Sequence, residues 1–473
     1  MPATPHAPAR RPAPLPLIAL SLGYFLVMLD VTVVNVAVPD IRDALRTGTS
    51  ALQWIVDGYS TAFAGLLLLG GGLGDRLGHR RTFLAGLAVF TGASAACGIA
   101  PSVGALVAGR LAQGAGAAFL VPASLALLQA TYPDRAARAR AIAVWGAVAS
   151  LAFGAGPAVG GLLVAGLDWR AVFWLNLPVG ALAVALTLRH VPAPARGVAR
   201  HRMDPLGHVL GVVGLIALAG ALNEAGSKGW TSPPVLGALG VGVVALVTFV
   251  RVERRLETRT ATGTSPTRAP LMPPSLFRNS AFAGAAAIGL LISLGYYGML
   301  FLTTLYFQQE RGLDALATGL ALLPSVCMGL IAAPLLARTA ARTGPYVPMA
   351  GGLVLGTTGF LGWLVAAPDT PYTTLLFALI ATGLGQTMTA LSATAAIIEA
   401  APEDSAGIAS AVFNVFRQVG SAVGVALFGT LTASAGDFTS GLRLSAGIAA
   451  AAFLVGALLA VAAVRRRDGL VRP

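Results

Sequence analysis

Fourteen long apolar runs constrain the fold of this chain more than any other feature of its sequence. A run of about 20 apolar residues forms a helix that crosses the roughly 30 Å hydrocarbon core of a bilayer. Only 11% of the residues are charged, against about 25% in soluble domains. The sequence therefore predicts an all-α polytopic membrane protein. The runs cover residues 15–39, 50–73, 82–100, 104–130, 141–166, 171–188, 206–224, 232–250, 281–308, 315–337, 345–367, 371–398, 405–433 and 444–464.

The basic residues between these runs predict the orientation of the chain. Of the 32 Lys and Arg, 24 fall on the side of the N-terminus and six on the opposite side, while Arg110 and Arg417 lie inside apolar runs. Because Lys and Arg are enriched in cytoplasmic loops, we expect both termini on the cytoplasmic side of a plasma (bacterial inner) membrane. The net charge of +13 is thus a signal of topology, and nucleic acid is not an expected partner.

Two longer polar connections divide the chain. Residues 189–205 and 251–280 are rich in Pro, Arg and Thr and are predicted as cytoplasmic linkers. The resulting organisation is six, two and six helices: a tail at 1–14, a bundle at 15–188, an inserted pair at 206–250, a second bundle at 281–464 and a tail at 465–473. Repeated halves around a midplane site are a common design of secondary transporters.

A carboxylate interrupts the first apolar run. Asp30 lies just beyond the middle of residues 15–39, where an Asp costs roughly 2.5 to 3.5 kcal/mol to insert. Such residues usually face protein or a wet cavity, and all five histidines fall at or outside helix ends, so carboxylates are the candidate proton carriers. Asp57, about two turns into the second run, is the other candidate. A purely structural Asp30, hydrogen-bonded between helices, remains an alternative.

Two further features lie inside apolar runs. Arg110 cannot lose its proton, so a buried Arg110 needs a hydrogen-bond acceptor. Its positive charge lowers the pKa of a nearby carboxylate, whereas burial raises that pKa. The competition between the two effects suits a carboxylate that titrates near neutral pH. The alternative is a structural Arg110 that only ties helix ends together. Gly156-Pro157 with Gly160-Gly161 removes one backbone hydrogen bond and permits close helix packing, either as a kink or as a pivot.

The loop at residues 71–81 and four other stretches carry a family resemblance. From Gly71 to Arg80 the sequence follows the pattern G-x-L-x-D-R-x-G-x-R. This pattern resembles the signature loop of the major facilitator superfamily. The alternative is an ordinary basic loop on the cytoplasmic side. Residues 106–118 and 156–161 resemble the helix 4 and helix 5 motifs of that superfamily, with Ala152 where a further glycine is usual. Residues 29–39 and 169–180 are similar to hallmarks of its fourteen-helix drug:proton antiporter branch.

The resemblance implies alternating access, with inward-moving protons exchanged for outward-moving hydrophobic, cationic or amphipathic compounds. It implies proton coupling by Asp30 and Arg110, with Asp57 as second carboxylate. The residues expected to serve conformational change are Gly71, Asp75, Arg76, Gly78, Arg80, Gly156, Pro157, Gly160 and Gly161. Adaptable apolar and polar side chains that we expect to line a substrate cavity are Tyr24, Phe25, Met28, Asn35, Tyr59, Gln113, Tyr296, Tyr297, Phe301, Phe413 and Phe416.

Other classes of protein are disfavoured. The sequence has no G-x-x-x-x-G-K-[ST] phosphate loop, no H-E-x-x-H and no G-x-S-x-G, so neither an ATP-driven pump nor an enzyme is expected. Cys97 and Cys327 lie far apart in apolar runs, and no metal or other cofactor is expected. The expected partners are small hydrophobic molecules, protons and lipid, with a monomer as a plausible state. A dedicated exporter of one antibiotic, metabolite or lipid, and a non-transporting membrane sensor, remain alternatives.

Overall fold

The structure is a computed structural model that describes residues 14–47, 49–192, 205–261, 270, 272–313, 315–402 and 405–471. All regular secondary structure in these ranges is helical. The α-helices are α1 (Pro14–Leu45), α2 (Thr49–Leu77), α3 (His79–Gly98), α4 (Val103–Thr131), α5 (Arg135–Gly166), α6 (Ala171–Trp174), α7 (Asn176–His190), α8 (Pro205–Lys228), α9 (Pro233–Ala261), α10 (Ser280–Leu305), α11 (Ala315–Val326), α12 (Gly329–Thr343), α13 (Tyr346–Gly362), α14 (Tyr372–Ala400), α15 (Ala406–Ser434) and α16 (Phe438–Val471). Short 3-10 turns lie at Pro274–Arg278 and Trp363–Val365, and a π-helical turn at Tyr306–Glu310 extends α10.

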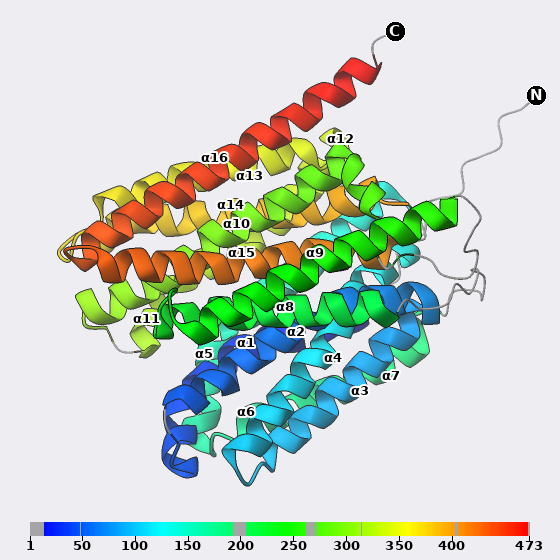
Figure 1. Cartoon of the computed structure of the whole chain (residues 1–473). Coiled ribbons are helices and arrows are strands. Elements are labelled where there is room, and N and C mark those ends of the chain that lie inside the picture. Colours follow the sequence, from blue (N-terminus) through cyan, green and yellow to red (C-terminus); the bar gives the residue numbers. More distant parts are fainter. Residues whose placement is uncertain are drawn as a thin grey trace, which may run out of the picture.

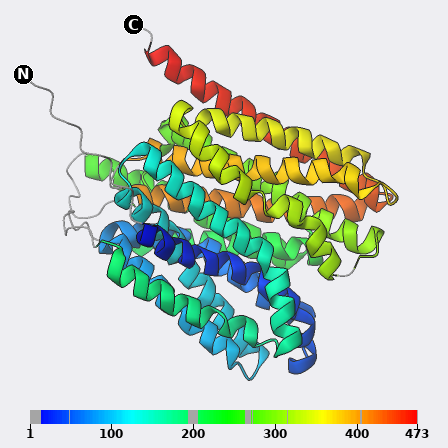
Figure 2. The ribbon, with the colours of Figure 1, turned by 180° about the vertical axis from the view of Figure 1, so that it is seen from behind.

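The helices form two groups with a pair between them. In Figure 1 the helices α1 to α7 (blue to cyan) lie below, and α10 to α16 (light green to red) lie above. The pair α8 and α9 crosses the front of both groups, and α8 packs against α2 and α15. Seen from behind, α1 begins and α16 ends on the same side of the bundle (Figure 2).

Twelve of the described segments are long and apolar enough to cross a membrane. These include α6 with α7, taken as Ala171–His190, and a segment that joins α11 to α12 at Ala317–Leu336. Helices α3 and α8 are not among the twelve. The structure is therefore that of a multi-pass membrane protein whose fold is all-helical, as the apolar runs predict.

Several helices extend past the apolar runs that predict them. Helix α9 continues to Ala261, so the first part of the predicted linker 251–280 is helical, and α16 continues to Val471 through most of the predicted tail 465–473. Both extensions are rich in Arg, and the first also in Glu, which are good helix formers. The prediction of these boundaries was wrong because an apolar run marks the part of a helix inside lipid, whereas helix propensity carries it into water.

Glycines set the spacing between α2 and α4. A Cβ atom at Gly70 would collide with the carbonyl oxygen of Ala118, and one at Gly114 would collide with that of Tyr59. Backbones approach this closely only where side chains are absent, as is usual for helices in membranes. The close contact places Arg110, one turn before Gly114, directly against α2.

Substituting Gly114 tests this contact. We expect Gly114→Ala to lower stability by about 1–3 kcal/mol, because the backbone of α2 must move away from the new methyl group. The measurement is thermal unfolding of the purified protein in detergent. Gly104→Ala on the same helix is the matched control, since a Cβ there meets nothing within 4 Å. Equal unfolding temperatures for the two variants would contradict the interpretation.

Candidate functional site

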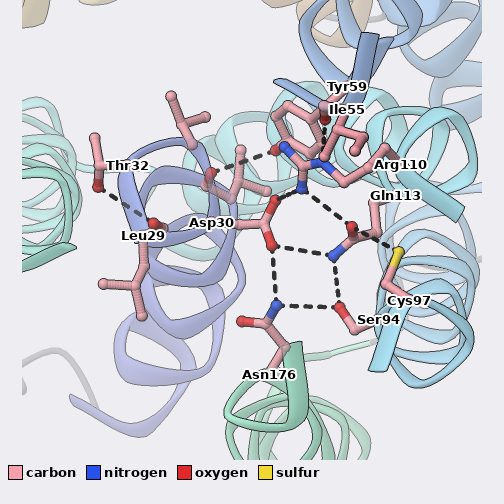
Figure 3. A network of polar contacts seen from close by, with 12 residues as sticks. Leu29, Asp30, Thr32, Ile55, Tyr59, Ser94, Cys97, Arg110, Gln113 and Asn176 are labelled. Carbon is pink, nitrogen blue, oxygen red and sulfur yellow. Dashed lines mark hydrogen bonds and ion pairs between the residues drawn. The ribbon is translucent and has the colours of Figure 1, made fainter. Parts of the chain in front are cut away.

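A buried network of polar side chains surrounds Asp30. The carboxylate is 0% exposed and accepts three hydrogen bonds: from Arg110 Nη1, from Gln113 Nε2 at 3.0 Å and from Asn176 Nδ2 at 3.1 Å (Figure 3). The donors come from α4 and α7, whereas Asp30 lies on α1. A carboxyl group that only accepts hydrogen bonds has the bonding pattern of an ionised carboxylate. The apolar run predicts a costly Asp30, and this network offsets that cost.

Arg110 is as fully surrounded as its partner. It is 1% exposed; its Nε donates to the carbonyl oxygen of Ile55 at 2.8 Å and its Nη1 also reaches Gln113 Oε1 at 3.1 Å. Its guanidinium carbon lies 4.6 Å from the centre of the Tyr59 ring, a cation–π contact. Arg110 and Gln113 are three residues apart on α4, so both side chains share one face of the helix. Each half of the ion pair therefore has satisfied hydrogen bonds as well as an opposite charge.

Helix α3 contributes the far side of the network. Ser94 Oγ accepts from Gln113 Nε2 at 2.7 Å and from Asn176 Nδ2 at 3.1 Å, and Cys97 Sγ lies 3.4 Å from Gln113 Oε1 (Figure 3). These contacts hold the two amide side chains with their N–H groups toward Asp30. The network thus joins α1, α2, α3, α4 and α7.

A separate cavity of about 90 Å³ lies between the two groups of helices. The rings of Tyr24 (α1) and Trp145 (α5) stack at one side, with their centres 3.8 Å apart and their planes 8° from parallel. Tyr296 and Tyr297 from α10 and Arg417 from α15 also belong to the lining, and Arg417 is hydrogen-bonded to Tyr24. Binding sites for drug-sized ligands measure roughly 300–1,000 Å³, so this cavity must widen before it can hold one.

Four of the eleven side chains that the sequence analysis assigns to a substrate cavity line this space: Tyr24, Met28, Tyr296 and Tyr297. Tyr59 and Gln113 belong to the network around Asp30. The other five do not line the cavity: Phe25 is half-buried, Asn35 is exposed, Phe301 is 38% exposed, Phe413 packs against Gly289, and Phe416 packs against Phe277. Asp57 is half-buried on α2, outside the network that the described residues form around Asp30.

Several residues of the network and cavity are not singled out by the sequence. Ser94 and Trp145 stand in runs of small apolar residues and carry no local signal. Gln386 lies in the stretch 382–386 of α14, which is weakly similar in sequence to residues 109–114 of α4. Asn176 lies in a stretch that supports the family resemblance. Arg417 is a charged residue inside an apolar run, as Arg110 is, and this feature of the sequence could have identified it as a candidate site residue.

The end of α2 connects the two groups of helices, and most of the loop predicted at residues 71–81 is helical, since α2 runs to Leu77 and α3 begins at His79. The Asp75 carboxylate accepts hydrogen bonds from the backbone N–H groups of Gly407 and Ile408, both at 3.1 Å, at the first turn of α15. Negative charge is favourable at this end of a helix. His79 Nε2 lies 3.2 Å from the same carboxylate. A Cβ atom at Gly71 would lie 2.7 Å from the carbonyl oxygen of Gly407, so the glycine permits this close approach.

The other conformational residues have local contacts. Gly78 adopts a φ of 94°, which favours glycine, and Arg80 Nη2 donates to the carbonyl oxygen of Leu188 at 2.8 Å. Arg76 lies in the last turn of α2. On α5, Gly156 faces Thr32 and Gly160 faces Val33, whereas Gly161 faces open space. Pro157 lies in α5, and its side chain is outside the described part of the chain.

Comparison with known proteins agrees with this architecture. Residues 20–210 and 205–425 match the Major Facilitator Superfamily. The chain belongs to the Major Facilitator Superfamily. The resemblance of the loop at residues 71–81 is therefore confirmed, and since the members of this superfamily are transporters, the chain is not expected to be an enzyme.

Relatives within the Major Facilitator Superfamily are resistance and export proteins. The chain is 37% identical to the methylenomycin A resistance protein of Streptomyces coelicolor, over 97% of this chain and 94% of that protein. It is 37% identical to the multidrug resistance protein Stp of Mycobacterium tuberculosis, over 89% and 76%. The crystal structure of the human organic anion transporter MFSD10 (TETRAN) shares the fold, with a TM-score of 0.63 at 18% identity, over 96% of this chain and 100% of that one.

The energetic dependence of the buried pair is testable by a double-mutant cycle. We expect Asp30→Asn and Arg110→Gln each to cost about 3–5 kcal/mol of stability, because each leaves one buried charge without its partner. The double variant should recover part of that loss, as no buried charge remains. Thermal unfolding in detergent measures all three, and Asp57→Asn is the control outside the network. Additive losses in the double variant would contradict the coupling.

The contact between α2 and α15 makes a second prediction. Asp75→Asn removes the charge but keeps the size of the side chain, so we expect faster backbone amide exchange at the first turn of α15. Hydrogen–deuterium exchange with mass spectrometry reads the peptide that contains Gly407 and Ile408. Asp43→Asn, at an exposed carboxylate 81% accessible to solvent, is the control and should leave that peptide unchanged. An unaltered peptide in Asp75→Asn would show that the cap does not hold this end of α15.

Proposed function

We propose that this protein is a proton-coupled antiporter that exports hydrophobic or amphipathic compounds across the plasma membrane by alternating access. The observation that carries the proposal is a titratable carboxylate, Asp30, buried with Arg110 beside a central cavity but outside its lining. Ionisable residues inside membrane spans mark proton and substrate pathways. Energy then comes from the proton gradient, and no cofactor takes part.

The position of Asp30 on α1 gives this proposal a mechanism. Tyr24 and Met28 are four residues apart and share the face of α1 toward the cavity, whereas Asp30 is rotated by about 200° from Met28. Helix α1 therefore lies between the carboxylate and the cavity. Protonation of Asp30 removes the negative charge that holds Arg110, and a substrate in the cavity pushes on the opposite face of the same helix.

Access alternates between the two sides through the contact of α2 with α15. In the proposed orientation this contact lies on the cytoplasmic side, where Asp75 caps α15, so the described conformation is closed to the cytoplasm. Opening requires that cap to break and the cavity to widen from about 90 Å³. Asp30 would take a proton in the outward-open state and release it inward, with Arg110 adjusting its affinity and Asp57 as a second carboxylate.

The finer topology belongs to the same proposal. Helices α3 and α8 would complete fourteen spans, arranged as six, two and six, with both termini cytoplasmic. Supporting this, α3 packs against α4 and α7, and α8 packs against α2, α9 and α15, so each is long enough and placed to lie among the spans. The start of α1 and the end of α16 on one side of the bundle fit an even number of crossings (Figure 2).

Relatives support export of antibiotics or other drugs. Their names include methylenomycin A resistance, multidrug resistance and cephamycin export. Of the cationic and amphipathic substrates expected from the sequence, we favour the amphipathic ones. The described residues that line the cavity include Arg417 and no carboxylate. An amphipathic compound with an aromatic or aliphatic body fits that lining better than a simple cation.

Proteoliposomes with an imposed pH gradient test the proposal. The wild-type protein should move a fluorescent amphiphile such as 8-anilinonaphthalene-1-sulfonate against its gradient, and dissipating the pH gradient should stop this movement. Asp30→Asn should lose gradient-driven flux by at least about tenfold, because the carboxyl group that carries the proton is gone.

A counterflow assay separates coupling from folding. Asp30→Asn is also assayed for counterflow, the exchange of labelled for unlabelled amphiphile without a pH gradient, which needs a folded transporter but no proton movement. Retained counterflow with lost gradient-driven flux supports the role of Asp30. Wild-type flux that ignores the pH gradient would contradict proton coupling, and Asp57→Asn with the larger loss would move the coupling role to Asp57.

A further inference from the structure

Two arginines lie inside the described membrane spans, and within the described part of the chain one of them, Arg110, has an acidic partner. Arg110 pairs with Asp30, whereas Arg417 on α15 lies in the lining of the central cavity. Among the described residues, no carboxylate lies within the 4.0 Å of a salt bridge to Arg417. A charged side chain within a membrane protein usually pairs with an opposite charge. Arg417 lacks that charge among the residues that the structure describes.

The hydrogen bonds of Arg417 are also incomplete. A guanidinium has five N–H donors and no acceptor. Arg417 Nη2 donates to the Tyr297 hydroxyl at 3.3 Å, and a second hydrogen bond joins its side chain to Tyr24. The centre of the Phe413 ring lies 5.9 Å from its Cζ. Its Nε is buried without a hydrogen-bond partner in the described structure. The group that completes the shell must bring acceptor atoms, and a negative charge makes those bonds stronger.

The rest of the lining selects for an apolar body next to that charge. Tyr24 and Trp145 present stacked rings, and Met28 and Phe153 add a flexible thioether and a further aromatic surface. Gln386 and Thr387 supply uncharged polar atoms. A small inorganic anion would leave these apolar surfaces without contacts, whereas an organic acid with a ring system would use both parts of the cavity.

We propose that the central cavity binds organic anions, with the carboxylate or sulfonate of the exported compound on the Arg417 guanidinium and its apolar body against Tyr24, Trp145 and Met28. This inference rests on the proposed function and names its substrate class. The anion supplies the charge that Arg417 lacks, so bound substrate lowers the cost of holding the guanidinium in the protein interior. The stacked rings orient the body toward α1, the helix whose other face carries Asp30.

Charge balance distinguishes this reading from export of a cation. When one proton enters for each anion that leaves, two elementary charges move in the same electrical direction. When one proton enters for each monovalent cation that leaves, no net charge moves. Export of an organic anion is therefore driven by an inside-negative membrane potential as well as by the pH gradient, whereas one-for-one export of a cation responds to the pH gradient alone.

Binding of three dansyl compounds to the full-length protein in detergent tests the proposal without any gradient. Dansylglycine, dansylglycinamide and dansylcadaverine share one fluorophore and are anionic, neutral and cationic at pH 7.5. We expect wild type to bind dansylglycine about tenfold or more tightly than the other two, since a charge-assisted hydrogen bond contributes on that scale. Equal affinities for the acid and its amide, or a preference for dansylcadaverine, would overturn the proposal.

Variants of Arg417 locate the effect. Arg417→Gln should weaken dansylglycine binding about ten- to hundredfold and leave dansylglycinamide unchanged, whereas Arg417→Lys should keep most of the preference for the acid. Arg342→Gln, which removes an exposed positive charge from α12, is the matched control and should bind as wild type. A preference that survives in Arg417→Gln would place the anion elsewhere. If Arg417→Gln fails to fold, the wild-type comparison of acid and amide still decides the substrate class.

Flux measurements separate this inference from the proposed function. In proteoliposomes, an inside-negative potential set by potassium and valinomycin should increase export of dansylglycine at a fixed pH gradient. Arg417-dependent binding without any gradient-driven flux would refute the antiport proposal and keep the anion site. Gradient-driven flux of dansylcadaverine, unchanged in Arg417→Gln, would keep the antiport proposal and refute the anion site.

Discussion

The ion pair between Asp30 and Arg110 is the constraint on which the first group of helices depends. Each charge, taken out of water alone, costs several kcal/mol, and mutual attraction offsets this only when the remaining hydrogen bonds are also made. Gln113, Asn176 and the carbonyl oxygen of Ile55 make them. Because these groups come from α2, α4 and α7, the pair fixes the positions of the helices around α1. Glycines at the contact of α2 with α4 let the two backbones approach closely enough for Arg110 to reach the carbonyl oxygen of Ile55.

The two halves of the chain treat buried positive charge differently. In the first half, Arg110 is neutralised internally and shielded by its neighbours, so its site offers nothing to a ligand. In the second half, Arg417 lines a cavity and bonds the uncharged side chains of Tyr24 and Tyr297, while its Nε has no hydrogen-bond partner among the described residues. Its site is therefore electrostatically incomplete. On the proposed mechanism, the Asp30–Arg110 site responds to protonation, and the bound substrate supplies the missing negative charge at the Arg417 site.

The sequence predicts what depends on composition along one helix, and it misses what depends on how helices face each other. Apolar runs locate the helices, and a charge inside a run marks Asp30 and Arg110, because lipid makes either exception costly. Ser94 and Trp145 have no such mark, since a small hydroxyl or an aromatic residue is ordinary in a membrane helix. The cap of α15 by Asp75 joins residues 332 positions apart, which no local pattern encodes. Helix ends were misplaced at residues 251–261 because propensity, rather than hydropathy, decides where a helix stops in water.

On the proposed mechanism, helix α1 is the element through which the proton and the substrate affect each other. Its two working faces are about 200° apart, so Asp30 and a ligand beside Met28 never compete for the same space. Coupling must then take the form of a movement of α1 as a whole. The contact with α5 permits that movement: the Thr32 hydroxyl donates to the carbonyl oxygen of Phe153 at 3.1 Å, and Gly156 and Gly160 present bare backbone to α1. A surface without protruding side chains lets α1 pack closely against α5, and it leaves no interlocking side chains at these positions to stop α1 from sliding or turning. The same glycines that resemble an antiporter motif in the sequence are thus placed where helix α1 has to move.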